Sequence, residues 1–427
     1  NEVTVKANLS IGDKQYKVNL SPTGQNLDMI GSNNKRAYKV RVLGEKKIYG
    51  MEEFKLLPPD SRHKMVEWVG HALEDKEGLT SLRYFFVELN LNGDDLGVYV
   101  IEEHFNKELL ENRKDDLLRN YGIDSKIVAV ADSKGVAINE KGININDILE
   151  IKKKNKSVSD LAIGDKNKSS IDLINEIDAE LLVDATPTNI QDGEPSASLL
   201  ESAMKTKKNI ITANKGPLAL AFSSVIEKAE YNNVVLKYSA TVGGGTPVLE
   251  FGRKCLEADR ILEMHAILNG TTNYMLTEMD NRGLSYQEAL KEAQELGYAE
   301  TDPTLDVDGF DAAAKLVIMG NLLLDKELVL NDLKIEGIRD ITQKDITKAK
   351  DNGDTIKLIA SVNDVAKVEP VRISKNDPMS VTGALCSVKF VSEFAGEEVI
   401  IGKGAGGMET ASAMIRDLVE IKQNMRV

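Results

Sequence analysis

The stretch GYAETDPTLDVDGFDAAAK, residues 297–315, concentrates acidic side chains next to a single lysine. Carboxylates at this density can bind a metal ion, hold an ammonium group or help a lysine to transfer a proton. The spacing of the residues distinguishes three interpretations: a calcium-binding loop, an acidic helix start on the surface, and a site for a charged substrate. The residues concerned are Glu300, Asp302, Asp306, Asp308, Asp311 and Lys315.

A calcium-binding EF-hand loop fits this stretch poorly. Such a loop needs acidic residues at positions one, three and five, glycine at six and glutamate at twelve. With Gly309 at position six, Thr304 takes position one and Lys315 takes position twelve. A lysine in place of the bidentate carboxylate argues against calcium.

An acidic helix start explains only part of the stretch. Capping and the helix dipole favour aspartate near a helix N-terminus, which accounts for Asp306 and Asp308. Asp311 and Lys315 are four residues apart, so they share one face of a helix that the sequence DAAAKLVIMGNLLL predicts to be largely buried. They are therefore either a structural pair or site residues with shifted pKa values.

The elements that must position these residues change in kind near residue 112. Before it, short alternating segments predict a β-rich α+β unit with one amphipathic helix at residues 60–72 and a hairpin turn at Asn92. After about residue 126, apolar strands alternate with helices, which predicts parallel βαβ units, and a second layered domain follows residue 245. The predicted strands of the first region are residues 3–11, 14–20, 37–43 and 83–103, and those of the βαβ region are residues 126–132, 179–189, 209–217 and 234–245.

Several predicted parallel strands end on residues that could contact a ligand, because ligands of such sheets bind outside the carboxyl ends of the strands. Asp132 could accept hydrogen bonds from a dinucleotide ribose, although aspartate is also a common turn residue. Lys215 precedes Gly216 and Pro217, which suit a helix start, and would point into the crevice. For one lysine, simple solvent exposure is the alternative.

The usual glycine fingerprint of a dinucleotide site is not where it should be. It should precede Asp132 by about twenty residues, yet residues 105–119 contain no glycine. The pattern G-x-G-x-x-G occurs instead at Gly402, Gly404 and Gly407, followed by too few residues for the rest of a βαβ unit. We interpret it as a glycine turn at a helix start, which either approaches an anion or an amide closely or serves only as a tight turn.

Composition narrows the class of protein. A length of 427 residues predicts two or three domains, and a net charge of −14 argues against a nucleic-acid surface. Two cysteines, Cys255 and Cys386, lack a metal-type spacing and fit a reducing compartment. No apolar run is long enough to span a bilayer, so we expect a soluble, cytoplasmic protein.

Residues 116–427 resemble a short homoserine dehydrogenase without a regulatory tail. The family signature runs from an alanine through a glycine to D-P-x-x-D-aliphatic-x-G-x-D-x-x-x-K, and it is met in full from Ala293 through Lys315. Further matching segments are DATPTN, TANKGPLA, ATVGGGTPV, ILNGTTNYML and GKGAGGMETASA.

The resemblance implies reversible reduction of L-aspartate 4-semialdehyde to L-homoserine with NADPH or NADH, a step toward threonine and methionine. It implies that Glu300 and Asp306 bind the substrate. It further implies that Lys315 donates the proton and that Lys215, paired with Asp311, lies between the cofactor and the reacting oxygen. This chemistry is reasonable, because hydride delivery builds negative charge on the carbonyl oxygen. A positioned ammonium can stabilise that charge and protonate the oxygen.

The same resemblance implies a cofactor site, a cation and a partner. Thr186, Gly297 and Gly406, with Lys215 and Asp132, would contact the nicotinamide cofactor. Backbone carbonyls of Val242 and Gly244 would bind a monovalent cation such as sodium, and the protein would be a homodimer. Asp132 favours the free ribose hydroxyl of NAD, whereas Lys134 could meet the 2′-phosphate of NADP.

The N-terminal region departs from this family. Residues 1–112 resemble the N-terminal part of a CotH kinase-like spore-coat protein, through the stretches KRAYKVRVLGEKKIYGMEEF and FVELNLNGDDLGVYVIEEHF. Lys39, Glu102 and Glu103 are residues that such a lobe would offer, although surface charges on a β-rich unit explain them more simply. Alternatives to a dehydrogenase are a CotH-like kinase or spore-associated binding protein, or an artificial composite without a single activity.

The expected fold class is therefore α/β. A Rossmann-like parallel sheet without its usual first strand would occupy residues 113–242 and about 402–427. An α+β catalytic and dimerisation domain would occupy residues 243–401, and the β-rich α+β unit would precede both. Because the glycine fingerprint is missing, weakened cofactor binding is expected.

Overall fold

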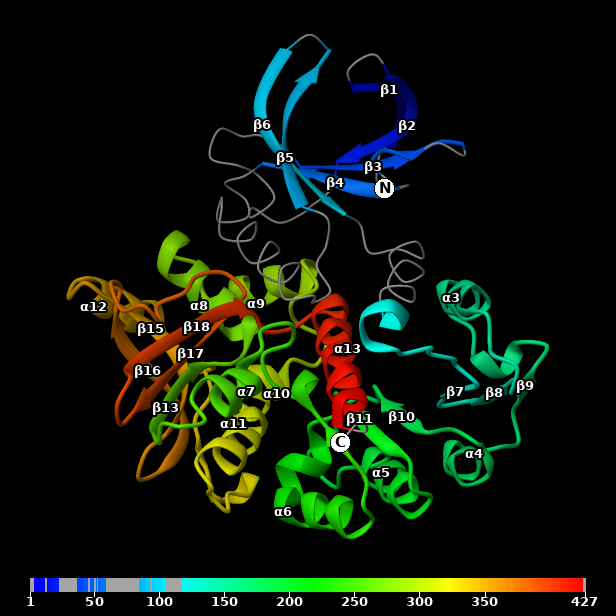
Figure 1. Cartoon of the computed structure of the whole chain (residues 1–427). Coiled ribbons are helices and arrows are strands. Elements are labelled where there is room, and N and C mark those ends of the chain that lie inside the picture. The colour runs from blue at the N-terminus through cyan, green and yellow to red at the C-terminus, as the bar shows by residue number, and fades with distance from the viewer. Residues whose placement is uncertain are drawn as a thin grey trace. The chain divides into compact units, whose positions relative to one another are not determined.

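A computed structural model describes residues 4–11, 14–22, 37–44, 47–49, 51, 53–58, 84–92, 94–103 and 117–424. The chain divides into two compact units, Asn1–Ser125 and Lys126–Val427. Figure 1 labels the elements of both units. The boundaries predicted at residues 112, 242 and 402 stay predictions.

The first unit is built on one antiparallel sheet with the strand order β1-β2-β3-β4-β6-β5. Its core contains Val40, Phe54 and Tyr99, which are fully buried. The predicted strands are confirmed, whereas β4 was not predicted, and the predicted helix at residues 60–72 lies outside the described residues. The elements are β1 (Val5–Ile11), β2 (Lys14–Pro22), β3 (Tyr38–Val42), β4 (Glu53–Leu57), β5 (Tyr84–Leu91), β6 (Asp94–Glu103) and the π-helical turn η3 (Leu117–Tyr121).

The second unit begins with two separate three-stranded sheets. One is parallel, in the order β10-β11-β12, and confirms three of the four predicted parallel strands. The other is antiparallel, in the order β7-β8-β9. The elements are β7 (Ala129–Asp132), β8 (Gly135–Ile138), α3 (Ile145–Lys153), η4 (Val158–Asp160), β9 (Gly164–Asp165), α4 (Ser170–Glu176), β10 (Leu181–Asp184), α5 (Ser196–Lys205), β11 (Asn209–Thr212), α6 (Gly216–Tyr231), β12 (Leu236–Lys237) and η5 (Ser239–Thr241).

The prediction of a parallel strand at residues 126–132 is wrong. This segment forms β7, which turns back at once into β8. The physical reason lies in the sequence between the strands, because Asp132 accepts a hydrogen bond from the backbone N–H of Lys134 and Gly135 adopts a positive φ of 141°. These features make a tight turn, for which aspartate and glycine are suited.

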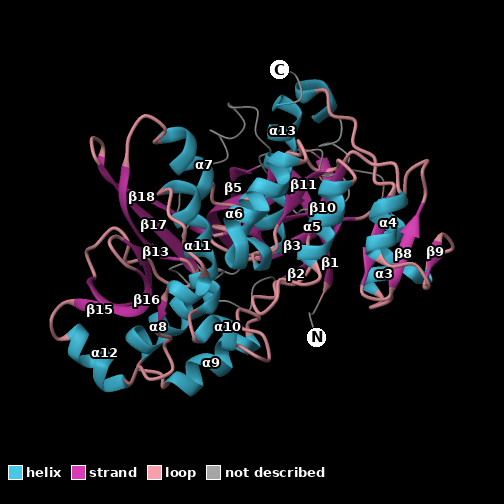
Figure 2. Cartoon of the chain, turned by 90° about the horizontal axis from the view of Figure 1, so that it is seen from below, coloured by secondary structure: helices cyan, strands magenta, loops and turns pink. Residues whose placement is uncertain are grey.

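A larger mixed sheet follows, in the order β14-β16-β15-β13-β17-β18, with helices on one side of it in Figure 2. Met264, Leu358 and Phe390 of this sheet pack against the helices in the main core of the unit. The elements are α7 (Val248–Glu250), η6 (Phe251–Cys255), β13 (Ile261–Ile267), α8 (Gly270–Arg282), α9 (Tyr286–Glu295), α10 (Thr304–Val307), α11 (Phe310–Leu323), η7 (Leu330–Asp332), β14 (Lys334–Ile335), α12 (Gln343–Lys350), β15 (Asp354–Val362), β16 (Ala366–Ser374), β17 (Leu385–Ser392), β18 (Gly396–Lys403) and α13 (Gly407–Asn424).

Helix α11 lies at the centre of this core, as its sequence predicts. Every residue from Ala312 to Asn321 is buried. A helix that is apolar on nearly all sides must be surrounded by other elements, and here α6, α10 and β15 pack against it. In the described part of the chain, no helix is both long and apolar enough to span a membrane.

Candidate active site

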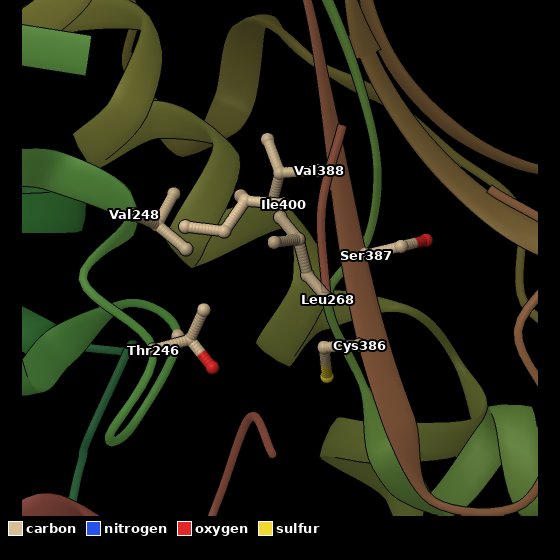
Figure 3. Close-up of a pocket in the computed structure, with 8 residues that line it drawn as sticks. Thr246, Val248, Leu268, Cys386, Ser387, Val388 and Ile400 are labelled. Atoms are coloured by element: carbon tan, nitrogen blue, oxygen red, sulfur yellow. The ribbon is translucent and has the colours of Figure 1, made fainter. Parts of the chain in front are cut away.

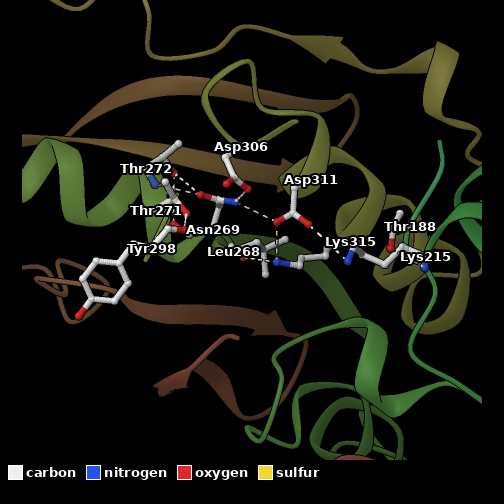
Figure 4. Close-up of polar contacts among 10 residues, drawn as sticks. All are labelled: Thr188, Lys215, Leu268, Asn269, Thr271, Thr272, Tyr298, Asp306, Asp311 and Lys315. Carbon is white, nitrogen blue, oxygen red and sulfur yellow. Dashed lines mark hydrogen bonds and ion pairs between the residues drawn. The ribbon is translucent and has the colours of Figure 1, made fainter. Parts of the chain in front are cut away.

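Two lysines from different parts of the second unit meet at one carboxylate (Figure 4). Lys215 lies between β11 and α6, whereas Asp311 and Lys315 lie in the first two turns of α11. The Nζ atom of Lys315 donates to Oδ2 of Asp311 over 2.6 Å, and Nζ of Lys215 lies 3.6 Å from Oδ1 of the same carboxylate. The structure therefore brings together the three residues predicted to handle the proton.

The ammonium of Lys315 is held in a fixed position. The residue is only 6% exposed, and Nζ also donates to the backbone oxygen of Leu268 over 2.7 Å. An ammonium carries three N–H groups, so these two bonds leave one donor for a reacting oxygen.

Charges and burial give the two lysines different properties. Burial would raise the pKa of Asp311 and lower that of Lys315, but the attraction between the two prevails, and at Asp311 it is helped by Lys215. It holds the pKa of Asp311 well below its usual range and raises that of Lys315. For Lys215, burial outweighs the attraction of Asp311 and lowers the pKa. Lys315 is thus an ammonium at neutral pH, as a proton donor to an alkoxide must be, whereas the pKa of Lys215 is lower than usual.

A second carboxylate, Asp306 of α10, is joined to this group through Asn269. The Nδ2 atom of Asn269 donates to Oδ1 of Asp306 over 2.7 Å and to Oδ2 of Asp311 over 2.9 Å. Burial raises the pKa of Asp306, and the charge of Asp311 adds to this effect. Asp306 therefore lies beside the lysine pair, in a position that suits a substrate-binding carboxylate.

Sequence reasoning did not single out Asn269 as a site residue. The available signal was an asparagine directly before a helical pattern, which is a common N-cap. Asn269 does cap α8, since its side chain accepts from the backbone N–H of Thr272. Nothing in that pattern shows that the other end of the amide reaches two carboxylates.

Glu300 is not brought into the cluster by any hydrogen bond among the described residues. The residue is exposed, and its backbone oxygen accepts from Nε2 of Gln294 over 3.0 Å. Its predicted role in binding the substrate with Asp306 stays a prediction.

Thr186 lies just beyond the carboxyl end of β10, in a group of polar residues joined by hydrogen bonds. The buried carboxylate of Asp184 accepts from Oγ1 of Thr186 over 2.7 Å and from Oγ1 of Thr212 on β11 over 2.9 Å. Nδ2 of Asn214 donates to Oγ1 of Thr186 over 2.9 Å. The ends of β10 and β11 are thus fixed to one another, and Lys215 follows directly.

The two glycines predicted to contact the cofactor lie in different surroundings. Gly297 has a φ of 78° and open space where a Cβ atom would lie, so its backbone can be approached. Gly406 has a φ of 136°, and a Cβ atom there would collide with Glu409. Both positions require glycine for conformational reasons.

The motif Gly402, Gly404, Gly407 forms the connection from β18 to α13. A Cβ atom at Gly404 would collide with Sγ of Cys386, and one at Gly402 would collide with Thr246. These two glycines therefore allow close packing, which supports the interpretation as a glycine turn rather than as the start of a Rossmann unit.

Val242 and Gly244, predicted to bind a cation, lie in the loop after η5. Gly244 has a φ of 57°, and a Cβ atom there would crowd the backbone of Gly404. In the described residues, no three His, Cys, Asp or Glu residues are grouped so that they could hold a metal ion. A cation here would depend on backbone carbonyls, so this site stays a prediction.

Asp132 has local partners for its carboxylate. It pairs with Lys152 and accepts from Oγ of Ser157 over 2.8 Å and from the backbone N–H of Val158 over 3.0 Å. Although partial burial opposes them, these bonds hold the pKa of Asp132 well below its usual range. Asp132 was predicted to end a parallel strand, but it ends the antiparallel strand β7. Its role toward a ribose stays a prediction.

Leu268, whose backbone oxygen accepts from Lys315, also lines a small apolar pocket (Figure 3). The pocket is lined by Leu268, Cys386, Val388 and Ile400, among others. Burial raises the pKa of Cys386 to about 11, so its thiol is neutral. The pocket thus shares Leu268 with the cluster, and its neutral thiol lies close enough to Lys315 to interact with the ammonium.

Comparison with known proteins identifies the family. The family model for homoserine dehydrogenase matches residues 247–419, and that for glutamate/leucine/phenylalanine/valine dehydrogenase matches residues 118–228. A homoserine dehydrogenase of Methanocaldococcus jannaschii is 41% identical over 74% of this chain and 94% of its own length. The chain belongs to the homoserine dehydrogenases.

Other homoserine dehydrogenases agree. An NAD(+)-dependent enzyme of Pseudomonas canavaninivorans is 35% identical over 74% of this chain and 92% of its own length. A solved hyperthermophilic archaeal homoserine dehydrogenase in complex with NADPH is 25% identical, with a TM-score of 0.65 over 74% of this chain and 94% of its own. The chain is thus an oxidoreductase of a family that uses NAD or NADP, with the α/β fold of that family.

Proposed function

We propose that the chain interconverts L-homoserine and L-aspartate 4-semialdehyde with NADP or NAD. The observation that carries this proposal is the meeting of Lys215 with the Asp311–Lys315 pair, at 3.6 Å and 2.6 Å from one carboxylate. Positioned cations beside a crevice suit a reaction in which charge develops on a carbonyl oxygen.

The charged residues have separate roles in this proposal. In the direction of reduction, hydride adds to the aldehyde carbon, and Lys315 donates a proton to the resulting alkoxide. Lys215 stabilises the negative charge, and Asp311 keeps both ammonium groups in place. Asp306 and Glu300 bind the ammonium of the amino-acid substrate.

A nicotinamide cofactor fits the crevice beyond β10 and β11, and when bound it supplies or accepts the hydride. The hydroxyl of Thr186, the ammonium of Lys215 and the accessible backbone of Gly297 suit the nicotinamide end. Gly406 and Asp132 are further candidates to contact the cofactor.

The pyrophosphate end of the cofactor site is less complete. Among the described strands, β10 pairs only with β11, and β7 belongs to a separate sheet. The usual first strand of a dinucleotide-binding sheet lies between the two corresponding neighbours and carries the glycine turn. We propose that this strand and turn are missing, so that cofactor binding is weakened.

A monovalent cation at the carbonyls of Val242 and Gly244 would complete the junction beside the glycine turn.

A homodimer would form through the face of the mixed sheet opposite its helices, since Ile401 on that sheet is 48% exposed. The proposed reaction would make the chain a cytoplasmic enzyme of threonine and methionine biosynthesis.

The first unit remains without an assigned role. The family models match residues 118–228 and 247–419, so they do not bear on residues 1–112. The CotH resemblance of that region stays a prediction. Lys39 forms an ion pair with Glu53 over 2.7 Å on the antiparallel sheet, as expected for a surface charge.

The test of the proposed function is cofactor-dependent turnover of the full chain. Reduction of L-aspartate 4-semialdehyde should consume NADPH or NADH, and Lys215→Ala should abolish the consumption. Cofactor titration by fluorescence, measured in parallel, separates weak cofactor binding from absent chemistry. Binding of cofactor without any turnover would overturn the proposal.

A further inference from the structure

We propose that Asn269 is a positioning residue that holds the Asp306 and Asp311 carboxylates side by side and thereby couples substrate binding to the lysine pair. This inference rests on the proposed function, in which Asp306 binds the substrate ammonium and Asp311 holds Lys215 and Lys315.

The geometry is that of one amide between two acids. Asn269 is 5% exposed, and its Nδ2 lies 2.7 Å from Oδ1 of Asp306 and 2.9 Å from Oδ2 of Asp311. A side-chain amide carries two N–H donors, so each carboxylate receives one. Two buried carboxylates would otherwise repel each other.

The other end of the amide fixes its orientation. Oδ1 of Asn269 accepts from the backbone N–H of Thr272 over 2.9 Å and lies 3.1 Å from its hydroxyl. Amide oxygen and nitrogen are often interchangeable in a structure. Here only one orientation is possible, because the N–H of Thr272 needs the oxygen and the carboxylates need the nitrogen.

The surrounding charges decide which carboxylate depends on this bond more. Asp311 faces the ammonium groups of Lys315 and Lys215, which keep it ionised. Asp306 faces the same two lysines at longer range, together with the charge of Asp311 and the hydroxyl of Thr271. Burial and Asp311 raise the pKa of Asp306, and the bond from Asn269 lowers it. Loss of Asn269 should therefore protonate Asp306 first.

Asn269→Ser separates this role from helix capping. Serine is a good N-cap, so it keeps the start of α8, but it is too short to reach both carboxylates. Asn269→Asp keeps the shape and the cap but places a third carboxylate beside the other two. Asn144→Ser is the matched control, since Asn144 caps α3 by accepting from the backbone N–H of Asn146 over 3.0 Å.

Thermal unfolding tests the proposal without reference to activity. The folded pKa of Asp306 is above its unfolded value, and Asn269→Ser should raise it further. Through Asp306, Asn269→Ser loses no stability below the unfolded pKa of Asp306. The loss grows as pH rises through the folded pKa of Asp306. We expect the Tm deficit of Asn269→Ser to be larger at about pH 8 than at about pH 5, by roughly 2 °C, and that of Asn269→Asp to be larger still. Asn144→Ser should give the same deficit at both pH values.

Kinetics provide the second measurement. The KM for homoserine should rise about tenfold in Asn269→Ser at neutral pH, with a smaller change in kcat, because binding depends on ionised Asp306. A pH-independent Tm deficit with an unchanged KM would show that Asn269 is only a helix cap and would overturn the inference. If the wild-type chain shows no turnover, the proposed function fails, while the Tm comparison still decides the role of Asn269.

Discussion

The unequal surroundings of two lysines are the central feature at the scale of residues. Lys315 is bound to Asp311 and to the backbone of Leu268, whereas Lys215 is bound only loosely to the other oxygen of Asp311. One ammonium is thus fixed and the other has a weakened hold on its proton. This arrangement can stabilise charge and transfer a proton.

Lys315→Met should lower kcat for the reduction of L-aspartate 4-semialdehyde by at least about 10²-fold, because it removes the fixed ammonium that donates the proton to the alkoxide. Lys208→Met is a suitable control, since Lys208 is also buried but lies just before β11, at the opposite end of that strand from the crevice. It should keep wild-type kcat. Turnover of Lys315→Met within about threefold of wild type would exclude Lys315 as the proton donor.

Asp306 should control binding of homoserine at acidic pH. Burial and Asp311 raise its pKa, so the ionised form that attracts an ammonium is lost at a higher pH than for an ordinary aspartate. The KM for homoserine should therefore rise as pH falls from about 8 to about 5, in steady-state assays at constant ionic strength. Asp306→Asn should have a high KM that no longer changes with pH, and a wild-type KM that is flat over this range would contradict this role.

At the scale of elements, helix α13 is held to the short helix η5 by a buried acid. Asp417 is 0% exposed and accepts from the backbone N–H of Ser239 over 3.0 Å and from its hydroxyl. Burial, aided by the charge of Glu250, raises the pKa of Asp417 to about 6. Its unfolded pKa is about 3.9, so the ionised acid destabilises the folded chain above pH 6 and this penalty disappears as pH falls.

Asp417→Asn removes that titration. The free energy of unfolding of the wild type relative to Asp417→Asn should increase by up to about 3 kcal/mol as pH falls from about 7 to about 4. Denaturant melts of both proteins at several pH values measure this difference. A difference that stays constant with pH would mean that Asp417 titrates normally in the folded protein.

The limits of sequence reasoning are also clearest for individual elements. Periodicity predicted α11 and the parallel strands β10 to β12, because apolar spacing reports directly on burial. It could not tell that residues 129–132 turn back on themselves, since a short apolar run looks the same in a parallel and an antiparallel sheet. The i, i+4 spacing placed Asp311 beside Lys315, but contacts distant in sequence, such as Asn269 with Asp306, leave no local pattern.

At the scale of the whole molecule, self-association is the main expectation. The apolar side chain of Ile401 is 48% exposed on a sheet whose helices lie on one side. Ile401→Arg should convert a dimer to a monomer in sedimentation velocity, because a buried unpaired charge is costly at an interface. Tyr231→Arg is the control, since Tyr231 is 90% exposed at the end of α6. An unchanged dimer in Ile401→Arg would exclude this face.

The central claim is that this chain transfers hydride between homoserine and a nicotinamide cofactor despite an incomplete pyrophosphate site. Homoserine deuterated at the alcohol carbon, incubated with the full chain and NADP or NAD, tests it most directly. We predict that mass spectrometry finds deuterium in the reduced cofactor and that the transfer is lost in Lys215→Ala. Cofactor that remains unlabelled, although it binds at the concentration used, would contradict the claim.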